Sequence, residues 1–410
     1  MKCLATLAAC ALAPPAAAAP PERSAAAFTD SVGVNVHLFY SDTPYRDSGA
    51  VRARLQELGV RHVRDGLAPN RPDQLAAIRH LHAAGIRHDL LLGAPGQDPW
   101  PLLRVVRDQL GGAIEALEGP NEYWSTGPGW QRRLVPFQRH LYTSVKADPR
   151  LARLTLVGSS VGDVDLSRSL DVGNLHPYPG GGPPEANLAQ ELGRAARVSG
   201  TKPVWATETG YHGALQMKRG SHQPATTDAA QAVYLPRLFA AYFAAGIPRT
   251  YAYELLDQFP DPGLTDPERH YGLLDHRMMP KPQFHALRRL LSATGDLRRG
   301  PKPSVLAPQV EDAGSGLRQL LLAHSDGTSR LLLWRAEPVG SDGRALRSPR
   351  SVTVRLGEPT ALRLSDPTWN RDRELAPAAT LRVIVGPALK VLRIGRPASP
   401  SASRRRTRRS

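Results

Sequence analysis

Two glutamates stand at the ends of otherwise apolar, strand-like stretches of the chain. Glu122 lies in Ile114-Glu-Ala-Leu-Glu-Gly-Pro-Asn-Glu-Tyr-Trp124, and Glu208 lies in Pro203-Val-Trp-Ala-Thr-Glu-Thr-Gly210. Cleavage of a glycosidic bond normally uses two carboxyl groups. The pair therefore predicts a site for sugar chemistry, with aromatic Tyr123 and Trp124 beside the first carboxylate. Taken singly, either glutamate could be an ordinary carboxylate at the end of a strand.

The elements that would position this pair follow a regular alternation of strands and helices. Eight such strands between residues 28 and 298 match a (β/α)8 TIM barrel, which typically has about 250 residues. An open, doubly wound sheet is the alternative, but the opening strand lacks the Gly-rich turn of a nucleotide-binding fold. The predicted strands are 33–40, 59–64, 85–92, a run ending at 122, 154–158, 172–178, 203–208 and 249–254. Helical spacing of apolar residues predicts helices at 50–58, 75–82, 102–110, 136–147, 185–198, 228–245 and 282–292.

Polar side chains collect at the ends of these predicted strands. In a barrel, the carboxyl ends of all strands meet at one face, and that face holds the active site. We therefore expect one rim to gather His37, Arg64, Asn121, Glu122, His176, Tyr178, Glu208, Tyr253 and Glu254. His37 and His176 are expected to bond to sugar hydroxyls, and Trp124 either stacks on a sugar or packs against the protein.

Beyond residue 300 the pattern changes to short strands separated by turn residues. Alternating polarity is typical of antiparallel strands with one exposed face, and it predicts a small C-terminal β-sandwich over 300–395. Nothing in this segment suggests catalysis. The residues from 396 to 410 are mostly Pro, Ser and Arg and predict a disordered basic tail. The sandwich strands are expected at 317–324, 329–334, 351–356, 381–385 and 389–394.

The first 20 residues have the features of a secretory signal peptide. Lys2 precedes a short apolar stretch and an Ala-rich cleavage region, so we expect a secreted or extracytoplasmic protein. Leu7-Ala-Ala-Cys10 resembles a lipoprotein box, but only nine residues precede Cys10, and we expect no lipid anchor there. Cys3 and Cys10 are the only cysteines, so the mature chain would have neither a disulfide nor a thiolate metal site. No apolar run approaches the roughly 20 residues of a membrane span.

The chain is strongly basic, with a formal charge of +16. Lys2 and the arginines of the tail account for only part of this charge. A basic body favours acidic polysaccharide or an anionic cell envelope, although an Arg-rich composition by itself gives the same charge. We find no nucleic-acid-binding module, no cofactor motif and no regular metal-ligand spacing, the acidic loop 257–268 included, and we expect a monomer.

The candidate residues together resemble the clan A retaining glycoside hydrolases, especially families 39 and 5, across about residues 28–395. The resemblance rests on Asn121-Glu122, Glu208, Arg64, His176-Pro-Tyr178, and the runs His270–Asp275 and Lys281–Leu287. It implies Glu122 as acid/base and Glu208 as nucleophile. It also implies that Asn121 binds the sugar 2-hydroxyl, that Tyr178 orients the nucleophile and that Arg64 holds its charge. Tyr253 and Glu254 stand where many members have Trp, and strand three offers only Asp89, so the substrate stays open.

Two other hypotheses fit the same residues. The chain could be a carbohydrate-binding or envelope protein on a scaffold that has lost its activity. It could also be an enzyme for acidic polysaccharide, with Lys218, Arg219 and His222 of the 211–227 loop reading uronic acids. The main prediction is a secreted hydrolase that cleaves β-linked oligo- or polysaccharide with two glutamates.

Overall fold

The computed structural model describes residues 21–160, 162–218, 223–297, 308–311 and 314–397 of the 410-residue chain. The predicted signal peptide with Cys3 and Cys10 lies outside the described residues, as does the tail beyond Pro397. The last strand runs to Pro397, so residues 396 and 397, predicted as part of the tail, belong to that strand. Among the described helices, none is long and apolar enough to cross a membrane.

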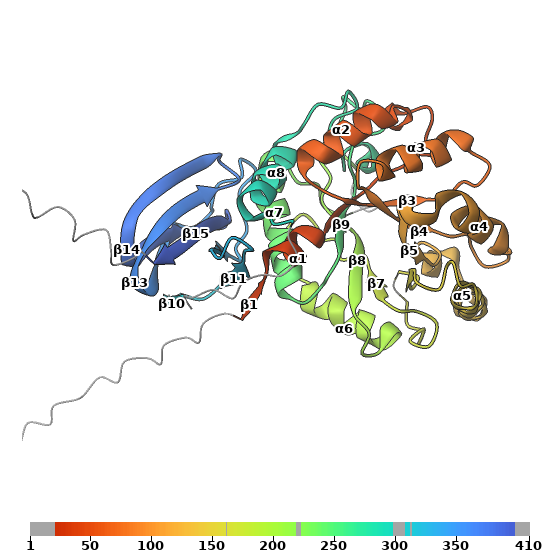
Figure 1. Ribbon diagram of the computed structural model, residues 1–410. Coiled ribbons are helices and arrows are strands. Elements are labelled where there is room, and N and C mark those ends of the chain that lie inside the picture. The colour runs from red at the N-terminus through yellow and green to blue at the C-terminus, as the bar shows by residue number, and fades with distance from the viewer. Residues whose placement is uncertain (1–20, 161, 219–222, 298–307, 312–313, 398–410) are drawn as a thin grey trace, which may run out of the picture.

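Eight parallel strands form the larger sheet, in the order β6-β5-β4-β3-β2-β9-β8-β7. A parallel bridge between Val157 and Val172 joins the two end strands. The sheet therefore closes into the predicted (β/α)8 barrel, seen at the right of Figure 1. Its strands are β2 (Val32–Asn35), β3 (His62–Gly66), β4 (Arg87–Leu91), β5 (Ile114–Glu118), β6 (Thr155–Val157), β7 (Gly173–Leu175), β8 (Val204–Thr209) and β9 (Thr250–Ala252).

Helices cover the outside of the barrel after every strand except β6, which a loop connects to β7. α5 begins at Trp130, not at Pro136 as predicted. Leu134 and Trp130 pack in a small core with Tyr123, and this burial holds the first turns although Pro136 lacks an N–H donor. The helices are α2 (Ser48–Leu58), α3 (Pro72–His82), α4 (Trp100–Val105) with the π-helical turn η2 (Val106–Leu110), α5 (Trp130–Ala147), α6 (Leu188–Ser199), α7 (Asp228–Ala244) and α8 (Pro282–Thr294).

A second sheet packs against α7 and α8, at the left of Figure 1. Its order is β1-β11-β12-β15-β13-β10, with β14 paired to β13. β1 (Glu22–Ser24) pairs parallel with β11 and was not predicted; α1 (Ala25–Asp30) follows it. The remaining strands are β10 (Gln309–Glu311), β11 (Leu317–Ala323), β12 (Ser329–Arg335), β13 (Arg350–Asp366), β14 (Arg371–Val385) and β15 (Lys390–Pro397).

Side-chain alternation explains how this sheet is buried on two faces. Leu331 and Leu333 of β12 enter a second core that all six strands from β10 to β15 supply. Leu332 and Trp334, which point the other way, belong to the core shared with the barrel helices. β13 bends where its register shifts between Arg355 and Leu362, so the sheet folds over the second core as a small sandwich.

Candidate active site

A cavity of about 490 Å³ lies over the carboxyl ends of the barrel strands. Seven of the ten predicted site residues line it: His37, Arg64, Asn121, Glu122, Tyr178, Glu208 and Tyr253. His176, Trp124 and the fully buried Glu254 do not. The wall also includes Asn35, Tyr40, Asp65, Glu268 and Tyr271, which were not predicted as site residues.

Glu208 is the more enclosed of the two catalytic candidates, with a side chain that is 11% exposed. It ends the apolar run of β8 and accepts hydrogen bonds from Arg64 Nη1 at 2.6 Å and from the Tyr178 hydroxyl at 3.0 Å. Burial opposes its ionisation, but the charges of His176 and Arg64 and these two hydrogen bonds outweigh burial. They lower the pKa of Glu208 below its ordinary value of 4.5, so the carboxylate is ionised at neutral pH.

Arg64, on β3, lines the cavity and contacts Glu208. Its Nε and Nη2 each donate to Glu118 at 2.7 Å in a bidentate pair, and Nη2 also donates to Asn121 Oδ1 at 2.9 Å. A further bond from Nη1 reaches Asn35 Oδ1 at 2.9 Å. Burial works against the guanidinium charge, but the Glu118 and Glu208 carboxylates raise the pKa of Arg64 well above its usual range. The guanidinium is thus a fixed cation with its hydrogens directed at defined acceptors.

Glu122 follows β5 in a backbone conformation that is rare for a residue with a side chain, with φ at +40°. Such a conformation persists only where the surroundings hold it, and here the Glu122 N–H donates to Ser160 Oγ at 2.9 Å. The loop begins at Gly119, where a Cβ would lie 2.2 Å from Gln138 Oε1. A Cβ there would also lie 3.0 Å from the Ser159 backbone N, so a larger residue would require both Gln138 and the chain at Ser159 to shift. The Glu122 side chain is 38% exposed and faces the cavity.

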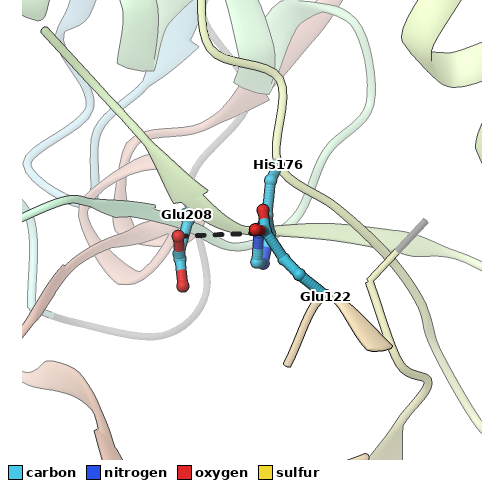
Figure 2. A group of neighbouring side chains, drawn as sticks. All are labelled: Glu122, His176 and Glu208. Atoms are coloured by element: carbon cyan, nitrogen blue, oxygen red, sulfur yellow. Dashed lines mark hydrogen bonds and ion pairs between the residues drawn. The ribbon is translucent and has the colours of Figure 1, made fainter. Parts of the chain in front are cut away.

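His176 contacts both glutamates, and Figure 2 shows its ring at the Glu122 carboxyl group with Glu208 across from it. Its Nδ1 is 2.8 Å from Glu122 Oε1 and 3.5 Å from Glu208 Oε2, and its Nε2 is 3.1 Å from Thr207 Oγ1. Both ring nitrogens thus have protein partners, and the ring does not line the cavity. The expected contact of His176 with sugar hydroxyls does not follow from this geometry, which directs the ring to Glu122.

The opposite wall of the cavity is aromatic. His37 stacks on Tyr40 with ring centroids 4.8 Å apart, and burial lowers the pKa of His37 to about 4, so this histidine is neutral at pH 7. The Tyr253 hydroxyl donates to Glu268 at 3.3 Å. Trp124 is 48% exposed and follows Glu122 outside the cavity lining.

Sequence reasoning missed the polar residues beneath the rim. Glu118 is fully buried and accepts hydrogen bonds from Arg64 and Asn174. The sequence did contain a signal for these residues, namely polar side chains within apolar strands. A barrel strand is buried on both faces, so a polar side chain in it needs a partner inside the protein.

One group of side chains in the described part of the chain has metal-ligand geometry, and it is the same trio. One polar atom from each of Glu122, His176 and Glu208 lies within 4.8 Å of the others. Arg64 already places a positive charge 2.6 Å from Glu208, which opposes a metal cation there. The arrangement therefore suits proton transfer and nucleophilic attack better than metal binding.

Comparison with solved structures identifies the fold. The chain matches a family 39 glycoside hydrolase from Bacteroides cellulosilyticus WH2 with a TM-score of 0.61 at 16% identity, covering 92% of this chain and 83% of that one. It matches a family 39 enzyme from Xanthomonas axonopodis pv. citri with a TM-score of 0.58 at 14% identity, covering 93% and 96%. A family 39 β-xylosidase from Caulobacter crescentus matches with a TM-score of 0.57 at 14% identity, covering 92% and 98%.

These matches span both the barrel and the sandwich. The protein therefore has the fold of the clan A, family 39 type, which confirms the resemblance drawn from the sequence at the level of fold. No protein-family model matches the sequence, and no curated protein matches it.

Proposed function

We propose that the protein is a retaining glycoside hydrolase that cleaves β-linked oligo- or polysaccharide. One observation carries the proposal: oxygens of the Glu122 and Glu208 carboxyl groups lie within 4.8 Å of each other beside one cavity. Retaining enzymes hold their carboxyl groups about 5–5.5 Å apart, whereas inverting enzymes need about 6.5–9.5 Å to admit a water. The short separation supports double displacement.

In the first step, Glu208 attacks the anomeric carbon and forms a glycosyl ester. Arg64 and Tyr178 hold the carboxylate ionised and fix its orientation toward the cavity. Glu122 gives its proton to the leaving glycosidic oxygen as that bond breaks. In the second step Glu122 removes a proton from water, which attacks the same carbon and releases Glu208.

His176 positions Glu122 and shares its proton in this mechanism. The Thr207 hydroxyl donates to Asn174 Oδ1 at 2.7 Å, so Thr207 Oγ1 accepts from His176 Nε2. The contact between Nδ1 and Glu122 Oε1 at 2.8 Å then requires one proton between these two groups. In the proposed mechanism, this is the proton that Glu122 transfers to the leaving glycosidic oxygen.

Asn121 contributes a hydrogen-bond donor to the bound sugar. Its Oδ1 accepts from Arg64, and this bond leaves the amide hydrogens to donate. A sugar hydroxyl next to the anomeric carbon would accept from them, in agreement with the role that the family resemblance implies.

The cavity favours an uncharged sugar. Asp65, Glu122, Glu208 and Glu268 line it, Arg64 is bound to protein carboxylates, and His37 is neutral at pH 7. Lys218 is exposed and does not line the cavity, whereas Arg219 and His222 lie outside the described residues. A uronic acid would find no cation free to pair with it among the described lining residues, so acidic polysaccharide is not the favoured substrate of this site.

The enzyme hypothesis is also favoured over a scaffold that has lost its activity. A binding protein needs neither a nucleophile held by Arg64 and Tyr178 nor an acid paired with His176. Secretion remains a separate proposal that rests on the leader sequence, and intact-mass analysis of the exported protein would test it by showing an N-terminus near Ala19-Pro20.

The two glutamates are distinguished by azide rescue. We expect Glu122→Ala to lower the rate about 10²–10⁴-fold, the usual contribution of acid–base catalysis, on substrates whose leaving group needs protonation. Aryl β-glycosides with a good leaving group should still glycosylate Glu208 in this variant, and azide should restore turnover with a β-glycosyl azide product.

Glu208→Ala should give the α-glycosyl azide, because azide fills the place of the nucleophile. Glu374→Ala on β14, whose side chain is 74% exposed, is the matched surface control and should retain full activity. Equal products from both catalytic variants, or full activity in either, would contradict the proposal.

A further inference from the structure

A cationic hollow of about 320 Å³ lies between α8 and the second sheet. Five arginines line it against two aspartates, Asp366 and Asp372. The arginines come from α8, β12, β13, β14 and β15, and they are Arg289, Arg330, Arg363, Arg371 and Arg393.

These arginines divide into structural and available groups. Arg289 donates to the carbonyl groups of Pro367 and Thr368, and Arg330 donates to the carbonyl group of Ala293. Arg371, in contrast, has no hydrogen-bond or ion-pair partner among the described residues. Within the described part of the chain, the Arg393 side chain has one ion-pair partner, Asp326, at 3.6 Å. The hollow therefore has anchored walls and guanidinium groups that are free to bind an anion.

Positive charge is in excess inside the hollow. Burial lowers the pKa of Arg330. The negative charge of Asp326 opposes this effect, whereas the positive charge of the neighbouring Arg393 adds to it. A bound anion would relieve this repulsion.

A second hollow of about 400 Å³ adjoins the first and shares Arg371 with it. Trp369 lines the second hollow and is 40% exposed, although large aromatic side chains are usually covered. Lys390 and Arg344 also line it. An exposed indole beside cations is suited to a ligand that has both an apolar face and a negative group.

The turn that carries Trp369 is held in place. It joins β13 to β14 and is fixed to α8 by Arg289, and the Thr368 hydroxyl donates to the Ala232 carbonyl group on α7 at 3.3 Å. A ligand would meet an aromatic face that is already positioned, which reduces the entropy lost on binding.

We propose that the two hollows form one binding site for an acidic polysaccharide, in which Trp369 stacks on a sugar ring and Arg371 binds an anionic group of the chain. The site shares no residue with the catalytic cavity. It goes beyond the proposed hydrolase function: it would hold the protein on an anionic polymer, while the carboxylate-lined cavity acts on uncharged sugars.

The test measures binding of fluorescently labelled polymers to the full chain by anisotropy. Polygalacturonate carries carboxylates, dextran sulfate carries sulfate esters, and dextran is uncharged. The wild type should bind one or both acidic polymers and should not bind dextran. The acidic polymer that binds with the higher affinity shows whether the site prefers carboxylates or sulfate esters.

Trp369→Ala and Arg371→Ala should each weaken this binding about tenfold or more, the size expected from one charge-assisted or stacking contact. Arg318→Ala is the matched control, because Arg318 is an exposed arginine of β11 that lines neither hollow. It removes the same charge and should leave the affinity unchanged. Melting temperatures of all variants should agree with that of the wild type, since each altered side chain is at the surface.

Three results would overturn the proposal. The first is absence of acidic-polymer binding by the wild type, and the second is equal loss in Arg318→Ala and Arg371→Ala, which would show a general charge effect. The third is unchanged binding in Trp369→Ala, which would remove the sugar contact. Each can occur with glycosidase activity intact, so failure here is distinct from failure of the catalytic proposal.

Discussion

Arg64 links the residues that hold Glu208, the proposed nucleophile, in its ionised form. Its guanidinium is bound on one side by Glu118 and on the other by Glu208, and Tyr178 donates to the remaining carboxylate oxygen. The contacts of Glu208 with Arg64 and Tyr178 both lower its pKa, because each favours the ionised carboxylate. The pH range of activity should therefore depend on them.

Replacing Tyr178 by Phe tests this dependence. The Tyr178 hydroxyl lowers the pKa of Glu208, so its removal should raise that pKa. Attack requires the ionised carboxylate, and the acid limb of kcat/KM should move to higher pH. In the wild type that limb should lie below pH 4.5, the ordinary value for a glutamate.

A pH series of kcat/KM with an aryl β-glycoside checks this prediction. Tyr142→Phe on α5 removes a phenol hydroxyl away from the site and should leave the limb in place. An unchanged limb in Tyr178→Phe, or a shift to lower pH, would show that Tyr178 does not hold the nucleophile.

At the scale of elements, α7 joins the barrel to the second sheet. Nearly every side chain between Ala230 and Phe243 is buried, because the helix has the barrel on one side and the sheet on the other (Figure 1). Arg237 of α7 is fully buried and donates to Glu185 Oε2 at 2.7 Å. Trp334 of β12 donates to the other oxygen of the same carboxylate at 2.6 Å. We infer that the second sheet stabilises the barrel through this contact.

Glu185→Ala should destabilise the whole chain. Loss of one partner leaves a buried charge uncompensated, which typically costs about 3–5 kcal/mol, and it also leaves the Trp334 indole without its acceptor. Unfolding in urea should show a lower midpoint for the variant.

The control is Glu311→Ala in the second sheet. Its ion pair with Arg355 has both partners exposed, and the stability should be nearly unchanged. A Glu185→Ala variant no less stable than this control would exclude the proposed role of the contact.

At the scale of the molecule, the two ends of the barrel have different charged groups. The carboxyl ends hold the candidate active site. At the amino ends, His62 Nδ1 contacts Glu115 at 2.6 Å and Nε2 contacts Asp30 at 3.0 Å. Arg249 lies 3.7 Å from Glu115. Burial works against ionised Glu115, but the His62 hydrogen bond and the Arg249 charge lower its pKa.

This end of the barrel should make stability sensitive to acid. A carboxylate whose pKa is lower in the folded state stabilises the fold above its unfolded pKa, and this contribution is lost as the pH falls through the folded value. Glu115→Gln should therefore be less stable than the wild type at pH 7, by about 1.5–3 kcal/mol for a hydrogen bond to a charged group. The difference should shrink as the pH falls below 4.5, the ordinary pKa of this group.

Urea unfolding at several pH values from 7 to 3 measures this difference. Glu358→Gln, at an exposed position of β13, should differ little from the wild type at any pH. A gap between Glu115→Gln and the wild type that stays constant or widens in acid would contradict the assignment.

The sequence alone determined the barrel and the placement of its two glutamates. Strand and helix periodicities are local, and all eight predicted strands overlap the strands of the closed sheet. Because parallel strands of a barrel end at one face, the positions of Glu122 and Glu208 in the chain were enough to predict a shared rim. The match to solved family 39 structures confirmed the predicted fold.

Only the tertiary structure decided what lies beneath and beyond that rim. Arg64 and Glu208 are 144 positions apart, and Arg64 and Glu118 are 54 apart. Periodicity cannot show which of such residues meet, nor that both nitrogens of His176 have protein partners. The five arginines of the cationic hollow likewise come from five separate elements. Their charge was visible in the composition, but its concentration at one place depends on how the second sheet packs on α8.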